Sequence, residues 1–491
     1  MVGTSIKKNF IYNLAYQILI IILPLITSPY CTRVLGSDRL GVYSISQAIA
    51  NYFVLFIMLG VSNYGNRTIA EVRDDKDKLS RTFFEIFFFQ LTMGVVVCLA
   101  YVVYCVFFIK MHRIIYALQF IYVLSAVFDI SWLFFGLEKF KATVTRSIII
   151  KLINAACIFI FVKDKGDLAL YTLILVLGLI INQLALWPIL LKNKYVTFVK
   201  PTFSGVVKHI KPNLILFIPV IAVSLYNIMD KIMLGGITHN NSEVGFYTYA
   251  ERIVQIPITL STALGTVMMP RMSNLNSKND TKSSQYLFDK AMQFSITTSM
   301  AFTFGLAAIS TTFIPWFYGE EFVRCGYFTI GLTPIIAIKA WAHVIRTQYI
   351  IPQKMDNAYI VSVFSGAAVN LLLNIVLIKI INGLGAIIAT VCAEFVVCII
   401  QFGFIRKRLE IKQYVIDAVA FIFIGIIMFV PVFMLSSVNM FAIGKMIVQV
   451  CIGGVIYLSL SYVYLVCIKK DRTLVNAVLN IIPLYKRRKS K

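Results

Sequence analysis

The chain has 491 residues, of which 59% are hydrophobic and only 14% are charged. A soluble domain is about half apolar and a quarter charged, so this composition excludes an ordinary soluble globular protein. The formal net charge of +24 would suit a nucleic-acid partner. We expect none, because the basic residues gather in the connections between long apolar blocks.

The apolar blocks are about 20 residues long, which is enough to span a hydrocarbon core of about 30 Å. They predict an all-α polytopic membrane protein with about fourteen transmembrane helices. The expected spans, in chain order, are 10–30, 40–62, 83–109, 114–136, 143–162, 168–191, 213–236, 247–270, 291–317, 326–351, 358–378, 384–405, 414–436 and 443–467. The segments 143–162 and 326–351 have the least regular hydrophobic pattern.

Lysine and arginine gather in connections that lie on one side of these predicted helices. Basic runs fall at 73–81, 192–211, 406–412 and 486–491. Cytoplasmic loops carry such an excess, so we expect a multi-pass membrane protein with both termini in the cytoplasm. The basic tail is expected to lie against anionic lipid head groups, which makes membrane lipids a partner.

The chain also contains an internal repeat. Residues 34–36 and 41–44 read Val-Leu-Gly and Gly-Val-Tyr-Ser, while residues 233–235 and 245–248 read Met-Leu-Gly and Gly-Phe-Tyr-Thr. Six spans separate the paired positions, an even number, so both copies enter the membrane in the same direction. The pattern predicts two pseudo-symmetric six-helix lobes. The expected divisions are 1–205 for the first lobe, 206–408 for the second, 409–470 for two further helices and 471–491 for the tail.

Among the basic residues inside the predicted helices, five are the candidates for function: Lys151, Lys231, Arg252, Lys339 and Arg346. A cation at bilayer depth costs about 2.5–3.5 kcal/mol on insertion scales unless it is paired or faces water. Two of the cations begin polar stripes, one from Arg252 and one from Lys339, at helical spacing. The chain is therefore expected to enclose a wet, positive cavity. Arg252, Lys231 and Arg346 lie near helix ends, and snorkelling to the membrane surface is an alternative for them.

Uncharged polar residues and acids accompany these cations in the membrane. Gln47, Asn51, Gln255 and Thr259 are candidates to line the cavity, although such residues also bond neighbouring helices. The acids Asp129, Asp230 and Glu394 are either counter-ions to the cations or a site for ion coupling. Both interpretations stay open for each of these residues.

Motifs for catalysis and cofactors are missing from the sequence. There is no phosphate-binding glycine loop, no metal-ligand helix motif and no nucleophile elbow. The nine cysteines form no CxxC pair. The pattern predicts no catalytic residue, no metal and no cofactor, and favours a protein that is not an enzyme. A membrane polysaccharide polymerase is the alternative from another class, and the short outer loops disfavour it.

Six short motifs stand out along the chain: residues 9–13, 33–36 and 41–43 near the start, then 129–132, 136–140 and 230–235. They resemble motifs of the Wzx-type polysaccharide flippases of the multidrug/oligosaccharidyl-lipid/polysaccharide exporter superfamily. The resemblance covers the whole predicted core and suits its fourteen-helix, two-lobe pattern. It implies a place in the bacterial cytoplasmic membrane, alternating access, and transport of undecaprenyl-pyrophosphate-linked oligosaccharide repeat units from the inner to the outer leaflet, for surface polysaccharide. Polysaccharide polymerase and chain-length machinery would be further partners.

That cargo matches the membrane cations. A pyrophosphate carries about two negative charges and pairs well with Arg and Lys. The five cations are thus candidates for the pyrophosphate, and Gln47, Asn51, Gln255 and Thr259 are candidates for the sugars. Two alternatives belong to the same superfamily. A peptidoglycan-precursor flippase would use similar chemistry, whereas a cation-coupled multidrug exporter would favour buried acids over buried cations.

Overall fold

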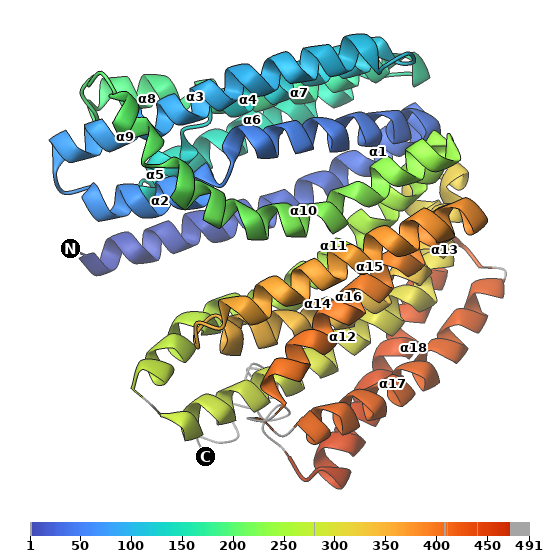
Figure 1. Cartoon of the computed structure of the whole chain (residues 1–491). Coiled ribbons are helices and arrows are strands. Elements are labelled where there is room, and N and C mark those ends of the chain that lie inside the picture. The colour runs from blue at the N-terminus through green and yellow to red at the C-terminus, as the bar shows by residue number, and fades with distance from the viewer. Residues whose placement is uncertain (1, 279, 407–408, 410, 439, 472–491) are drawn as a thin grey trace. The chain divides into compact units, whose positions relative to one another are not determined.

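The computed structural model describes residues 2–471 except 279, 407–408, 410 and 439 (Figure 1). These residues form α-helices with short 3-10 and π-helical turns, and no β-strand occurs among them. In the described part, twelve helical segments are long and apolar enough to cross a membrane. Because helices satisfy their backbone hydrogen bonds internally, they suit hydrocarbon. The prediction of an all-α polytopic membrane protein is confirmed.

The first two predicted spans form the two arms of one element, α1 (Val2–Met58). The arms meet at Gly36, whose φ of 75° and ψ of 173° interrupt the helix. A positive φ strains residues that carry a Cβ, so glycine permits this kink. The predicted span 247–270 lies in α11 (Asn241–Ser277), which is outside the set of twelve. These two differences separate the fourteen expected spans from the twelve that the structure shows.

The first compact unit is Met1–Gly245. After α1 it contains α2 (Val61–Val72), α3 (Lys76–Phe107), α4 (Arg113–Val127), α5 (Ser131–Gly136), α6 (Phe140–Phe161), η1 (Lys165–Asp167), α7 (Leu168–Leu184), α8 (Leu186–Lys192), α9 (Phe203–Val207) and α10 (Ile210–Thr238). Apolar side chains of α2, α3, α5 and α8 form one of its cores. The buried indole of Trp132 lies in this core and donates a hydrogen bond to Gln90 Oε1 at 3.1 Å.

The connection between α8 and α10 is fastened to α3 by a buried carboxylate. Glu85 on α3 is 1% exposed and pairs with Lys208 Nζ at 2.6 Å. His209 Nε2 lies 3.2 Å from the same carboxylate. A buried carboxylate needs such partners, because removing its charge from water costs several kcal/mol. These contacts hold the residues that lead into α10.

The second compact unit is Phe246–Lys491. After α11 it contains α12 (Thr281–Tyr318), η2 (Glu320–Phe322), α13 (Val323–Leu332), α14 (Pro334–Ile345), η3 (Arg346–Ile350), α15 (Asp356–Ile381), α16 (Gly383–Ile405), α17 (Ile411–Met434), η4 (Leu435–Ser437), α18 (Ala442–Tyr462) and η5 (Val463–Ile468). Helix α12 packs along α14, α17 and α18. The irregular predicted span 326–351 is divided among α13, α14 and the π-helical η3, with Pro334 opening α14.

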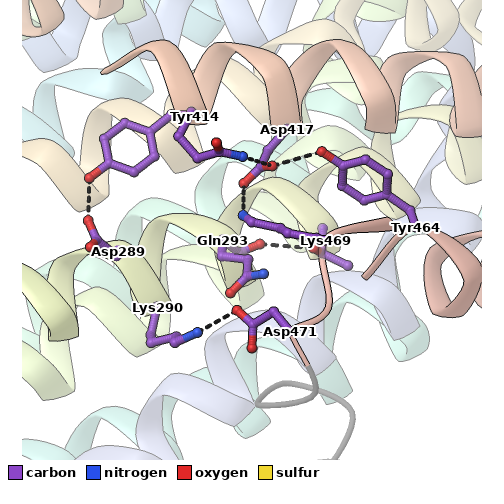
Figure 2. Close-up of polar contacts among 10 residues, drawn as sticks. Asp289, Lys290, Gln293, Tyr414, Asp417, Tyr464, Lys469 and Asp471 are labelled. Atoms are coloured by element: carbon purple, nitrogen blue, oxygen red, sulfur yellow. Dashed lines mark hydrogen bonds and ion pairs between the residues drawn. The ribbon is translucent and has the colours of Figure 1, made fainter. Parts of the chain in front are cut away.

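Polar contacts join the last two long helices to the rest of this unit (Figure 2). The Asp417 carboxylate on α17 is 2% exposed and accepts hydrogen bonds from Tyr464 Oη, at 2.9 Å, and from Lys469 Nζ. Lys290 on α12 pairs with Asp471 at 2.6 Å. The helices expected at 409–470 thus pack on α12, and the hydrogen bonds of Asp417 join α17 to the residues that follow α18. The rest of the predicted tail, 472–491, lies outside the described residues.

The two compact units divide the chain at a different point from the predicted lobes. The boundary between the compact units falls between Gly245 and Phe246. Helix α10 belongs to the first unit, where it packs on α1 and α2. The lobe boundary after residue 205 comes from the internal repeat and not from contacts. The division into two six-helix lobes and two further helices therefore stays a prediction.

The repeated motifs contact each other within the first unit. A Cβ on Gly41 would lie 1.8 Å from the backbone oxygen of Asn241, and one on Gly245 would lie 2.3 Å from that of Ser37. The repeat pairs Gly41 with Gly245 and, at the same sequence offset, Ser37 with Asn241. The two close approaches are thus reciprocal. Paired motifs related by a two-fold axis make contacts of this kind.

Candidate functional site

Helix α11 carries the predicted stripe that begins at Arg252. The Arg252 guanidinium is half-buried, and its carbon lies 4.5 Å from the centre of the Tyr249 ring. The Tyr249 ring is buried and packs edge-on against Tyr318 at 5.2 Å. Gln255 is exposed, while the hydroxyl of Thr259 donates to the Gln255 backbone oxygen at 2.9 Å. The arginine therefore rests on a fixed aromatic ring, and Gln255 is the accessible amide of the stripe.

Helix α14 and the following η3 carry the second stripe. Lys339 Nζ lies 2.9 Å from Glu394 Oε1 of α16. One turn further along α14, His343 Nδ1 lies 2.9 Å from Arg346 Nη2. The Arg346 guanidinium also lies 5.6 Å from the centre of the Tyr359 ring. Each cation of this stripe thus has a side-chain neighbour that orients it.

The two stripes belong to adjacent helices of the second unit. The backbone of Thr262, on α11, contacts the imidazole of His343 on α14. Further along both helices, Gln348 Nε2 lies 3.8 Å from the sulfur of Met268. Later residues of one helix meet later residues of the other, so the two helices run in the same direction.

The three cations of these stripes lie at different levels. We measure their positions along the helix axes from the level where Thr262 meets His343, at about 1.5 Å per residue. Arg252 lies about 15 Å before that level and Lys339 about 6 Å before it, whereas Arg346 lies about 4.5 Å beyond it. Cations on neighbouring levels can share one anionic group through their long side chains. Arg252 and Arg346 are about 20 Å apart along the axis, so one such group cannot touch both.

The remaining predicted cations lie in the first unit. Lys151 is half-buried on α6, and Lys231 is half-buried on α10 beside Asp230, which is 1% exposed. The structure adds Arg146 on α6, whose Nε and Nη1 atoms are buried and whose Nη2 lies 3.4 Å from Ser147 Oγ. The sequence interpretation missed this arginine. Its position inside the predicted span 143–162 was the available signal.

Of the two predicted polar residues of α1, Asn51 contacts another helix of the first unit. Asn51 Oδ1 accepts a hydrogen bond from Tyr122 Oη of α4 at 3.1 Å. Gln47 lies one turn earlier and is half-buried. The Asn51 amide oxygen thus contributes to helix packing, the interpretation that the sequence left open beside sugar contact.

Asp129 shapes the break between α4 and α5. Its Oδ1 accepts the backbone N–H of Ser131 at 2.9 Å, and its backbone oxygen accepts from Trp132 Nε1 at 3.0 Å. Such local side-chain bonds favour turns and helix starts. Of the three acids, Glu394 has the clearest counter-ion geometry, next to Lys339. Among the described residues, no group of three or more His, Cys, Asp or Glu is arranged to hold a metal ion.

Comparison with solved structures defines the class of protein. A lipid II flippase MurJ in an inward closed conformation covers 93% of this chain and 99% of its own, with a TM-score of 0.74 and 14% identity. An inward-facing multidrug resistance MATE family transporter of the MOP superfamily covers 81% of this chain and 97% of its own, with a TM-score of 0.60 and 13% identity. The chain is therefore a multi-pass helical membrane protein with the fold of this transporter superfamily.

Sequence comparison shows the family. The model described as "Polysaccharide biosynthesis protein" matches residues 6–276, and the chain belongs to that family. A relative from Escherichia coli (strain K12), named "Putative O-antigen transporter", is 24% identical over 82% of this chain and 97% of its own length. The lipid II flippase MurJ of Bacillus subtilis is 22% identical over 44% of this chain and 42% of its own. The resemblance to Wzx-type flippases is confirmed.

Proposed function

We propose that this protein flips undecaprenyl-pyrophosphate-linked oligosaccharide repeat units from the inner to the outer leaflet of the bacterial cytoplasmic membrane. The product would feed surface polysaccharide synthesis, and the transport would proceed by alternating access with both termini in the cytoplasm. The observation that carries this proposal is the set of three membrane cations, Arg252, Lys339 and Arg346, on adjacent helices of one unit.

The chemistry of these cations suits a pyrophosphate. Arginine presents N–H groups in a planar fork that matches phosphate oxygens, and lysine offers three donors on a flexible stem. Because the cations lie at successive levels, the head group would contact neighbouring pairs in turn. Gln255 is exposed beside Arg252 and is the best placed of the proposed sugar contacts. Lys151 and Lys231 remain secondary candidates for the phosphate.

The membrane potential can drive such a movement. With the cell interior negative, each negative charge that moves outward gains about 2.3 kcal/mol per 100 mV. A pyrophosphate carries about two such charges, so its export is downhill. Ion coupling through Asp129, Asp230 or Glu394 is therefore not required by the energetics. Consumption of the product outside, by a polymerase and chain-length machinery, would add to the driving force.

A peptidoglycan-precursor flippase is the second candidate function, because a lipid II flippase is both a sequence relative and a fold neighbour. The family match to polysaccharide biosynthesis and the O-antigen relative favour the first candidate. A multidrug exporter has the same fold. A cation-coupled exporter would, however, favour buried acids over the cations that α11 and α14 carry.

Alanine substitution in cells that depend on this protein tests the proposal. Arg252→Ala and Lys339→Ala should each abolish surface polysaccharide at an unchanged protein level, while Arg252→Lys should retain part of it. Arg271→Ala is the matched control, because Arg271 is an exposed arginine on the same helix. Normal polymer from both alanine variants would remove the assignment of these cations to the phosphate.

A further inference from the structure

The Lys339–Glu394 pair is asymmetric in its exposure. The Lys339 side chain is 25% exposed and that of Glu394 only 4%, with Nζ and Oε1 2.9 Å apart. Lysine is thus the partner that solvent or a ligand can reach. The carboxylate lies behind it, on a different helix.

The surroundings of Glu394 on α16 are closely packed. One turn before it, Thr390 Oγ1 forms a hydrogen bond with Tyr247 Oη at 2.9 Å. One turn after it, the buried side chain of Cys398 packs with Ile338 and Ala342 of α14. These contacts hold α16 against both α11 and α14. The carboxylate therefore has a fixed position from which it orients the Lys339 ammonium.

Stability alone does not explain this pair. Removing two charges from water costs several kcal/mol each, and well-packed apolar residues in place of a buried ion pair are often as stable. The pair does, however, change what an incoming anion meets. An ammonium–carboxylate pair has little net charge, so it attracts an anion less strongly than an ammonium alone.

Building on the proposed function, we propose that Glu394 is a positioning residue that lowers the affinity of the Lys339 site for the cargo's phosphate. The Glu394 carboxylate holds the Lys339 ammonium at 2.9 Å. Its negative charge repels the phosphate, which limits affinity and allows release. Charges about 6 Å apart interact appreciably at an effective dielectric constant of about 20, so neutralising Glu394 should tighten phosphate binding by about tenfold or more.

Direct binding to the purified full-length protein tests this role. The probes are inorganic pyrophosphate and farnesyl pyrophosphate, measured by calorimetry without added metal. Glu394→Gln should lower the dissociation constant of both probes about tenfold and slow the dissociation of farnesyl pyrophosphate. Glu320→Gln, which removes an exposed acid of the same unit, is the control for net charge and should leave both values unchanged.

Two further variants separate this role from folding and from the proposed function. The Lys339→Ala/Glu394→Gln double variant should not show the increase in affinity. Glu394→Asp, whose carboxylate is withdrawn by one methylene, should bind with an affinity between those of the wild type and Glu394→Gln. The role of Glu394 would be overturned if folded Glu394→Gln and Glu394→Asp bound the probes no more tightly than the wild type while Lys339→Ala still lost binding. That result would leave the proposed phosphate site intact. Wild-type affinity in both Lys339→Ala and Arg252→Ala would instead contradict the proposed phosphate site.

Discussion

At the scale of single residues, each candidate cation of the second unit has a partner that orients it. Arg252 lies over Tyr249, Arg346 lies near His343 and Tyr359, and Lys339 pairs with Glu394. An aromatic ring contacts the flat face of a guanidinium, whereas a phosphate contacts its N–H edge. The Tyr249 ring thus leaves the N–H edge of Arg252 uncovered by its own contact, whereas Lys339 is oriented by a carboxylate.

The Tyr249 ring should therefore support Arg252 through its π face. Tyr249→Leu removes that face, and a cation–π contact of about 0.5–2 kcal/mol corresponds to a loss of roughly two- to thirtyfold in pyrophosphate affinity. Tyr249→Phe keeps the ring and should bind nearly as wild type. Calorimetry with inorganic pyrophosphate measures both. Equal affinities for the Leu and Phe variants would show that the ring plays no part.

At the scale of helices, glycine sets how closely the first unit packs its repeated motifs. The approaches of Gly41 to Asn241 and of Gly245 to Ser37 leave no room for a methyl group, because backbone atoms cannot rotate away. The hydrogen bond from Asn241 Nδ2 to Asp38 Oδ1, at 3.2 Å, joins the same two segments. The close packing of α1 with the start of α11 thus depends on these two positions.

Adding a methyl group at either position should destabilise the protein. Gly41→Ala and Gly245→Ala force the backbone apart, and overpacking of this kind costs about 1–3 kcal/mol. Both variants should melt at lower temperature in detergent and accumulate less in cells. Gly236→Ala is the control, since nothing lies within 4 Å of a Cβ there. Equal melting temperatures for all three variants would mean that the segments separate at no cost.

Much of this helical arrangement follows from the sequence pattern. Apolar blocks of membrane length predicted most helices, and the three- and four-residue spacing from Arg252 and Lys339 predicted stripes that now prove to lie on adjacent helices. The sequence pattern could not predict which side chains pair in the folded protein. Glu394 lies on α16 and Lys339 on α14, and nothing in the sequence shows that the two are in contact. The repeat likewise paired Gly41 with Gly245 but could not show the reciprocal contact.

At the scale of the whole molecule, the chain consists of two compact units of similar length, each built of membrane helices. The candidate phosphate contacts with the clearest geometry lie in the second unit, spread over about 20 Å of helix axis. That spread suits a cargo head group that must meet a cation whichever leaflet the site faces. In the proposed cycle, the membrane potential drives the outward movement of the negatively charged head group.

Transport in reconstituted vesicles tests this central proposal most directly. The vesicles would carry a fluorescent undecaprenyl-pyrophosphate-linked oligosaccharide on one leaflet and an imposed membrane potential, with a membrane-impermeant quencher reporting its arrival on the other. We expect the wild-type protein to move the cargo toward the positive side, and the Arg252→Ala/Lys339→Ala double variant to match protein-free vesicles. Equal transport by the wild-type protein and the double variant would contradict the account.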